Sequence, residues 1–132
     1  MGAATPFAQD ARGFQGQRVL IVEDELLLAM DYEELLKREG CTVLGPVGRR
    51  AQALALLERE RPDVAILDLN LAGERSTAVA EALEARGVPF VIVSGYAERT
   101  LREPVLRRAP RLDKPAKQQD LVRIIAALGR RG

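Results

Sequence analysis

The sequence predicts an α/β protein in which a parallel five-stranded β-sheet carries helices on both faces. Between residues 18 and 128, five short apolar segments alternate with segments of helical spacing. Such alternation is typical of strands joined by helical crossovers, which make neighbouring strands parallel. The strand-like segments are apolar throughout instead of alternating with polar residues, which indicates burial on both faces of the sheet.

The five expected strands are short and rich in Val, Leu and Ile. They cover residues 19–23, 42–45, 64–67, 90–93 and 111–113. Pro46 is expected to close the second strand, because proline cannot donate a hydrogen bond to a neighbouring strand. The crossovers between these strands should be right-handed.

Helical spacing predicts four clear helices, over residues 25–39, 49–61, 76 or 77 to 86, and 117–128. In the first of these, Leu27, Met30 and Leu35 are expected to share the inner face. Residues 96–108 predict only a short or frayed helix, because Pro104 removes a backbone donor in the middle of the segment.

The length of 132 residues fits one domain. We expect a flexible N-terminal tail over residues 1–17, a folded domain over 18–129, a C-terminal tail over 130–132, and no output domain. The formal net charge of +1 does not indicate a nucleic-acid partner. Without a signal-peptide core or an apolar run of about 18 residues, the sequence predicts a cytoplasmic protein with no membrane partner.

Polar side chains stand where the expected strands end. Glu23 and Asp24 follow the first strand, and Asp68 follows the third. Ser94 and Lys114 follow the fourth and fifth strands. Because the carboxyl ends of parallel strands meet at one edge of a sheet, where such folds bind ligands, we expect these side chains to share a crevice.

The acidic part of this crevice predicts a magnesium site. Glu23, Asp24 and Asp68 would repel one another and raise each other's pKa values unless a cation lay between them. Mg²⁺ prefers oxygen ligands, and the backbone carbonyl of Asn70 is a further candidate. An alternative is that such acids only cap helices or face water, and for Glu23 taken alone this alternative is preferred.

The complete set of residues favours phosphoryl transfer. A carboxylate such as Asp68 can carry a phosphoryl group as an acyl phosphate. The Lys114 ammonium and the Ser94 hydroxyl are suited to bind two of the phosphoryl oxygens, and Mg²⁺ a third. We also expect the Lys114–Pro115 peptide bond to be cis.

Other chemistries fit the sequence poorly. The chain has no histidine, which excludes a Ser-His-Asp triad and a histidine metal site. It also lacks the glycine-rich nucleotide-binding loops. A phosphatase of the haloacid dehalogenase type typically needs a second Asp two residues after the nucleophile, and that position is Asn70. The sequence therefore predicts a phosphoacceptor and not an enzyme that hydrolyses phosphate esters.

The motifs at the strand ends resemble those of the receiver domain of bacterial two-component response regulators. The resemblance covers residues 18–128 and rests on Val-Glu-Asp-Glu at 22–25, Leu-Asp-Leu-Asn at 67–70, Val-Ser-Gly-Tyr at 93–96 and Asp-Lys-Pro at 113–115. It implies a (βα)5 flavodoxin-like (CheY-like) three-layer sandwich with strand order 2-1-3-4-5.

The resemblance also implies a role for each residue. Asp68 would be the phosphoacceptor, and Glu23 and Asp24 would take the place of the acidic metal pair of the family. Ser94 would be the switch residue that moves toward the phosphoryl group. Lys114 would be the lysine that senses phosphate.

Two positions depart from most receivers and affect the switch. The family usually has an aromatic switch residue three positions before the lysine, where this chain has Arg111. Tyr96 is the nearest aromatic residue and is expected to replace that switch, to gate the pocket, or only to pack. Residues 88–96, Val-Pro-Phe-Val-Ile-Val-Ser-Gly-Tyr, resemble the FATGUY group of single-domain response regulators, although the stretch from Ile92 to Ser94 differs. Such proteins lack the aromatic switch and pair with histidine kinases of the HWE/HisKA2 type.

We therefore expect a single-domain response regulator that accepts a phosphoryl group on Asp68 from a sensor histidine kinase, with Mg²⁺ as cofactor. Its signal would pass to a downstream phosphotransfer or effector protein by contact, or the domain would act as a phosphate sink. The alternative from another class is an adaptor with a receiver fold whose contacts do not depend on phosphorylation. The small phosphatase is the weaker third interpretation.

Overall fold

The computed structural model describes residues 15–95 and 101–129. The strands are β1 (Arg18–Val22), β2 (Thr42–Val47), β3 (Val64–Asp68), β4 (Asn70–Leu71), β5 (Glu74–Arg75), β6 (Phe90–Ser94) and β7 (Arg111–Asp113). The helices are α2 (Leu26–Arg38), α3 (Arg50–Arg59), α4 (Thr77–Ala85), α5 (Pro104–Arg108) and α6 (Gln118–Gly129). No helix in these two ranges is long and apolar enough to cross a membrane.

The main sheet has five strands in the order β2-β1-β3-β6-β7, and all of its pairings are parallel. This confirms the predicted fold class and the order 2-1-3-4-5, since β6 and β7 are the fourth and fifth strands of that sheet. Val22 at the end of β1 pairs with Leu67, and Asp68 at the end of β3 pairs with Val93. The carboxyl ends of these strands therefore lie side by side.

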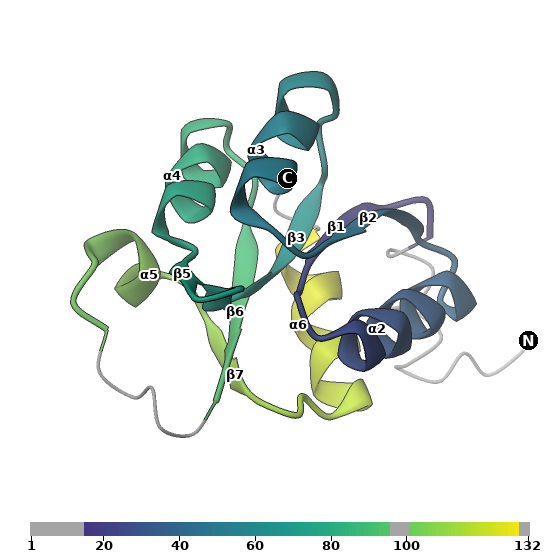
Figure 1. The fold of residues 1–132 in the computed structure, drawn as a ribbon. Coiled ribbons are helices and arrows are strands. Elements are labelled where there is room, and N and C mark those ends of the chain that lie inside the picture. Colours follow the sequence, from purple (N-terminus) through teal and green to yellow (C-terminus); the bar gives the residue numbers. More distant parts are fainter. Residues whose placement is uncertain (1–14, 96–100, 130–132) are drawn as a thin grey trace, which may run out of the picture.

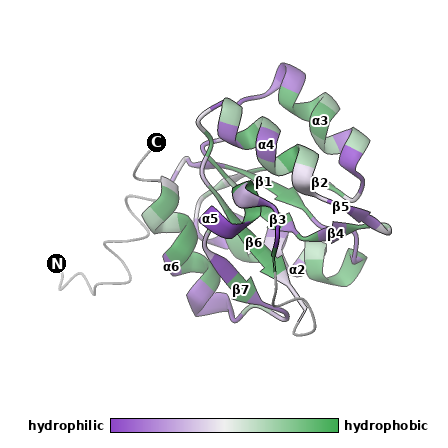
Figure 2. Ribbon diagram, turned by 90° about the vertical axis from the view of Figure 1, so that its left-hand side faces the viewer, coloured by the Kyte–Doolittle hydropathy of each residue, from purple (hydrophilic) through white to green (hydrophobic). Residues whose placement is uncertain are grey.

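Helices cover both faces of the sheet, with α3, α4 and α5 on one face and α2 and α6 on the other (Figure 1). Alternate residues of β1 enter different cores. Leu20 and Val22 pack with α3, α4 and α5, whereas Val19 and Ile21 pack with α2 and α6. The central strands β1, β3 and β6 are hydrophobic (Figure 2) except for Arg18 at the start of β1 and for Asp68 and Ser94 at the ends of β3 and β6. Their burial on both faces explains why their sequences do not alternate.

The inner face of α2 differs from the prediction. Leu35 is buried as expected, but Leu27 and Met30 are 76% and 52% exposed. The residues that face the sheet are instead Ala29, Tyr32, Leu35 and Leu36. Their spacing of three and four places them on one stripe of the helix, and Leu27 and Met30 lie off that stripe. The prediction for these two residues was wrong.

Pro46 and Pro104 both lie at positions where a strand or a helix tolerates proline. Strand β2 continues through Pro46 to Val47, beyond the predicted end at Gly45. It pairs only with β1, so it is an edge strand, where proline is tolerated. Pro104 is at the start of α5 and not in its interior, and the missing donor costs little there. The remainder of the predicted helix includes residues 96–100, which lie outside the described residues.

A small hairpin directly after β3 was not predicted. Strands β4 and β5 pair in antiparallel fashion, with Asn70 opposite Arg75. Ala72 and Gly73 form its tip, and both have positive φ, 49° and 86°. Two-residue turns of this kind need left-handed backbone, which glycine adopts readily. The hairpin matters for the site because its tip reaches Asp24.

Candidate functional site

Four strand ends at one edge of the sheet carry the predicted polar residues. Glu23 follows β1, Asp68 and Ser94 end β3 and β6, and Lys114 follows β7. Ser94 pairs with Asp113, the residue before Lys114. Only 3% of Glu23, 4% of Asp68 and 1% of Ser94 is exposed. Neighbouring hydrophobic strands hold these residues in place, so the site forms at the edge of the sheet, which is the rigid part of the fold.

Three carboxylates gather at this edge. Glu23, Asp24 and Asp68 each offer an oxygen atom, and these oxygens lie within 4.8 Å of one another. Backbone donors orient two of the side chains, since the Glu25 N–H donates to Glu23 Oε2 at 2.9 Å and the Ala72 N–H donates to Asp24 Oδ2 at 3.0 Å. Asp24 is exposed, whereas the other two acids are buried. One open side and three oxygen donors suit a hard divalent cation that keeps several waters.

Lys114 closes the site from β7. Its ammonium group donates to Asp68 Oδ2 at 3.0 Å, to Glu23 Oε2 at 3.2 Å and to Glu25 Oε2 at 2.9 Å. Burial by itself would lower the pKa of Lys114, but the hydrogen bonds to Glu25 and Asp68 outweigh it and raise the pKa. Lys114 therefore stays charged. The Lys114–Pro115 peptide bond is cis, as expected.

The acids of the site titrate unequally. Burial raises the pKa of Asp68 to about 8, and the neighbouring Asp24 and Glu23 carboxylates act in the same direction. Burial would also raise the pKa of Asp24, but hydrogen bonds from the Asp68 side chain and the Ala72 N–H lower it. At neutral pH these two acids therefore share a proton that resides on Asp68. A carboxylate pair held together by a proton is a place where a cation can replace that proton.

The Ser94 hydroxyl is buried without a hydrogen-bond partner. A buried hydroxyl without a hydrogen-bond partner lowers the stability of the fold, and such a group often has a functional role, for example in binding a ligand. The backbone carbonyl of Ser94 accepts a hydrogen bond of 2.8 Å from the Lys114 N–H, which ties the two strand ends together. The hydroxyl, the ammonium and the carboxylate of Asp68 can together receive a group with several acceptor oxygens, such as phosphate.

The remaining residues predicted for the site are Asn70, Arg111 and Tyr96. The Asn70 N–H donates to Asp68 Oδ1 at 3.4 Å, so Asn70 borders the site, and the use of its carbonyl as a ligand stays a prediction. Arg111 is half-buried on β7 opposite Ile92, where it lines a surface hollow with Asp113. Tyr96 lies outside the described residues, so its predicted part in the switch stays a prediction.

Sequence reasoning missed three contributors. The side chain of Glu25 binds Lys114, although its position directly after the two predicted ligands was a signal. The N–H of Ala72 reaches Asp24 across 48 positions of sequence. The Tyr32 hydroxyl on α2 is buried without a partner, and burial together with the Glu23 charge raises its pKa to about 12. No local sequence pattern indicates the roles of Ala72 and Tyr32, because these roles depend on tertiary contacts.

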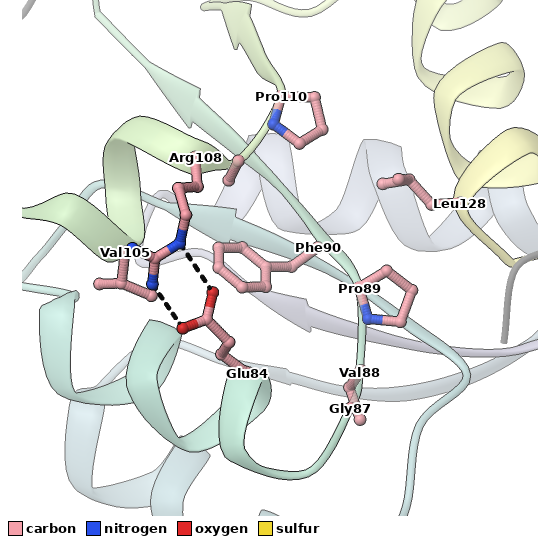
Figure 3. A pocket seen from close by; sticks show the side chains of 10 residues that line it. Glu84, Gly87, Val88, Pro89, Phe90, Val105, Arg108, Pro110 and Leu128 are labelled. Carbon is pink, nitrogen blue, oxygen red and sulfur yellow. Dashed lines mark hydrogen bonds and ion pairs between the residues drawn. The ribbon is translucent and has the colours of Figure 1, made fainter.

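A hollow of about 330 Å³ lies at the other end of β6, where Phe90 begins the strand that Ser94 ends. Figure 3 shows Phe90 beside the ion pair of Glu84 and Arg108, with Pro110 above Phe90 and Pro89 to its right. The four residue steps between Phe90 and Ser94 correspond to about 13 Å of extended strand. This hollow is therefore separate from the carboxylate site.

Comparison with known proteins agrees with this geometry. Residues 19–126 match the response regulator receiver domain. The transcriptional regulatory protein PdtaR of Mycobacterium tuberculosis is 35% identical over 95 residues, which are 71% of this chain and 46% of PdtaR. The chain spans about half the length of the curated relatives it matches.

Solved receiver structures share the fold. SdrG from Sphingomonas melonis is 43% identical with a TM-score of 0.74, and the match covers 87% of this chain and 97% of SdrG. The receiver domain of the sensor histidine kinase PA1611 from Pseudomonas aeruginosa is 28% identical, with a TM-score of 0.74 and coverage of 86% and 98%. That structure holds a magnesium ion in the active site cleft. This chain belongs to the receiver domain family of response regulators.

Proposed function

We propose that this receiver domain accepts a phosphoryl group on Asp68 from a sensor histidine kinase. The observation that carries the proposal is the combination of three groups at neighbouring strand ends. The Asp68 carboxylate is buried, the Lys114 ammonium lies 3.0 Å from it, and the Ser94 hydroxyl is buried without a partner. A phosphoryl group on Asp68 gives both donors an acceptor oxygen.

The transfer is a displacement at phosphorus. An Asp68 oxygen forms a bond to phosphorus while the bond from phosphorus to the donor breaks, and the donor atom keeps the electron pair. From a phosphohistidine the leaving atom is a ring nitrogen, and no atom is oxidised or reduced. Lys114 and Ser94 then donate to phosphoryl oxygens. A magnesium ion held by Glu23, Asp24, Asp68 and the Asn70 carbonyl would supply further positive charge there.

Asp68 must lose its proton before it can attack. Its pKa of about 8 means that most molecules carry this proton at neutral pH when no cation is bound. The Lys114 ammonium lowers this pKa but does not overcome burial. Reactivity is therefore expected to depend on added positive charge at the three carboxylates, which is the reason for proposing magnesium as the cofactor.

The donor is proposed to be a protein. Leu26, Leu27 and Met30 are 70%, 76% and 52% exposed. They lie in the first turns of α2, which begins directly after Glu25, the residue whose side chain binds Lys114. An apolar group of this kind beside a reactive carboxylate suits a partner surface that brings its phosphohistidine to Asp68. The resemblance to the FATGUY group makes a kinase of the HWE/HisKA2 type the first candidate.

We further propose that the domain acts in the cytoplasm as a single-domain response regulator. It passes its signal to a downstream phosphotransfer or effector protein, or it serves as a phosphate sink. The resemblance of residues 88–96 to the FATGUY group supports this single-domain assignment. The proposed role is that of a stoichiometric acceptor, and a small phosphatase is disfavoured because Asn70 stands where a second catalytic Asp would be needed.

The test is intact mass after incubation with acetyl phosphate, with and without Mg²⁺. Wild type should gain one phosphoryl group only with Mg²⁺, and Asp68→Asn should gain none. Asp31→Asn, which removes an exposed carboxylate on α2, is the matched control and should behave as wild type. No gain in wild type under any condition would favour the adaptor, whose partner binding survives Asp68→Asn and needs no Mg²⁺.

A further inference from the structure

All donor hydrogens of the Lys114 ammonium are already in use. A lysine ammonium has three hydrogen atoms to donate. Lys114 uses them for Glu23 at 3.2 Å, Asp68 at 3.0 Å and Glu25 at 2.9 Å. A phosphoryl oxygen can therefore bind Lys114 only if one of these three carboxylates withdraws.

Glu25 is the partner that can withdraw. Its side chain is 58% exposed, whereas those of Glu23 and Asp68 are 1% and 6% exposed. Its carboxylate is outside the cluster of three acids whose oxygens lie within 4.8 Å of one another. Glu23 and Asp68 are fixed by burial and are needed for the cation and for the new bond. The side chain of Glu25 has neither constraint.

The backbone of Glu25, and not its side chain, makes the hydrogen bonds that support the local structure. Its N–H donates to Glu23 Oε2 at 2.9 Å, and its carbonyl accepts the first helical hydrogen bond of α2, from Ala29 at 2.9 Å. Glu25 is the N-cap of α2, yet its side chain makes no capping hydrogen bond. A substitution that keeps the backbone therefore changes the contact with Lys114 and leaves the helix start and Glu23 in place.

We propose that the Glu25 carboxylate is a built-in competitor for the phosphoryl group at Lys114, and so determines how readily the site accepts phosphoryl donors. In the unphosphorylated protein Glu25 occupies the donor hydrogen that a phosphoryl oxygen needs. After transfer, the phosphoryl group takes that position and the Glu25 side chain moves into solvent. This inference rests on the proposed function, and it adds a residue that regulates the rate of phosphorylation at the same site.

The proposed competition predicts the direction in which the phosphorylation rate changes when Glu25 is replaced. Glu25→Gln weakens the contact that must be broken, so it should speed phosphorylation by acetyl phosphate. We expect an increase of about twofold to fivefold, the range that corresponds to one partly exposed ion pair. If Glu25 instead held Lys114 in its working position, the same substitution would slow phosphorylation. The direction of the change therefore separates competition from support.

The experiment measures the initial rate of phosphorylation by acetyl phosphate and Mg²⁺ in four proteins: wild type, Glu25→Gln, Lys114→Met, and the double variant. The rate increase from Glu25→Gln should disappear in the Lys114→Met background, because the competition acts through Lys114. Glu34→Gln is the matched control. Glu34 lies on the same helix, is 73% exposed and pairs with Arg38, so its substitution makes the same change in charge away from the site.

A second measurement follows the contact itself. The Nζ chemical shift of ¹⁵N-labelled Lys114 should differ between wild type and Glu25→Gln before phosphorylation, and should coincide afterwards, when Glu25 has left. An unchanged or lower rate in Glu25→Gln, or an equal increase in Glu34→Gln, overturns the inference while phosphorylation of wild type upholds the proposed function. Absence of phosphorylation in wild type overturns both.

Discussion

The ammonium of Lys114 donates a hydrogen bond of 3.0 Å to the Asp68 carboxylate, although 46 positions of sequence separate the two residues. The contact joins the end of β3 to the residue after β7, and β6 lies between these strands in the sheet. It places a cation beside an acid whose neighbours are also acids. The stability and the reactivity of the site both depend on this pair.

Replacement of Lys114 by Met should slow phosphorylation to a lower but measurable rate and destabilise the protein when no divalent cation is present. The substitution leaves the buried Glu23 carboxylate without its cation and the Asp68 carboxyl group without its donor. Removing one partner of a buried ion pair costs about 3–5 kcal/mol at most. Urea unfolding with and without Mg²⁺ measures this cost. Lys37→Met breaks an exposed pair with Glu33 and should cost less than about 1 kcal/mol. Equal costs for the two variants would contradict the arrangement described for Lys114.

The free energy of unfolding should fall as the pH rises from about 4 to 8 in the absence of divalent cations. The folded protein holds the proton of Asp68 up to a pKa of about 8, whereas an ordinary aspartate has a pKa of 3.8. A raised pKa stabilises the fold at low pH, and this contribution is lost as the pH approaches the folded value.

Denaturant unfolding at several pH values measures this trend, and Asp68→Asn is the control in which it should be weaker. Mg²⁺ at pH 8 should restore stability, by about 2.7 kcal/mol when its concentration is one hundred times its dissociation constant. A wild type whose pH dependence matches that of Asp68→Asn would mean that Asp68 does not hold the proton.

Ser94→Ala should leave the fold almost unchanged and weaken retention of the phosphoryl group. The Ser94 hydroxyl has no partner in the unphosphorylated protein, so its removal leaves no other group unpaired. We expect a change in stability within about 1 kcal/mol and a lower level of phosphorylation at equilibrium. Phosphate-affinity electrophoresis and thermal unfolding measure the two effects.

Ser76→Ala is the matched control for Ser94→Ala. Ser76 is also fully buried with an unpartnered hydroxyl, but it precedes α4 instead of ending a strand at the carboxylates. Its substitution should leave phosphorylation as in wild type. A common effect of both variants on phosphorylation would point to general loosening of the core and away from a contact between Ser94 and the phosphoryl group.

Leu27→Ser should reduce phosphorylation by a kinase without affecting phosphorylation by acetyl phosphate. Leu27 is 76% exposed, so its loss should change stability by no more than about 0.5 kcal/mol. Phosphorylation rates measured in parallel with the kinase and with acetyl phosphate separate an effect on kinase binding from an effect on phosphoryl transfer itself. Leu36→Ala, on the buried side of α2, should instead cost about 2–5 kcal/mol of stability. Equal kinase rates for wild type and Leu27→Ser would remove Leu27 from the proposed donor surface.

The main strands, their parallel arrangement and the polar residues at their ends could all be predicted from the order of the amino acids. Hydrophobic periodicity is a local property, and runs such as residues 64–67 are apolar because both faces of β3 are buried. From these runs it follows that Asp68, Ser94 and Lys114 stand at one edge of the sheet. Pro46 misled the prediction of where β2 ends, because tolerance of proline there depends on an edge strand that composition does not reveal. The helix predicted near Pro104 is short as expected, and the proline stands at its start.

The remaining features of the site depend on how the chain packs in three dimensions. The contact of Glu25 with Lys114, the approach of Ala72 to Asp24 and the exposure of Leu27 each depend on segments that are distant in sequence. No periodicity encodes such contacts, because they arise from the register of the sheet and from how each helix settles against it. The sequence thus determined which chemical groups the site contains, and packing determined which of them touch and which stay open to a partner.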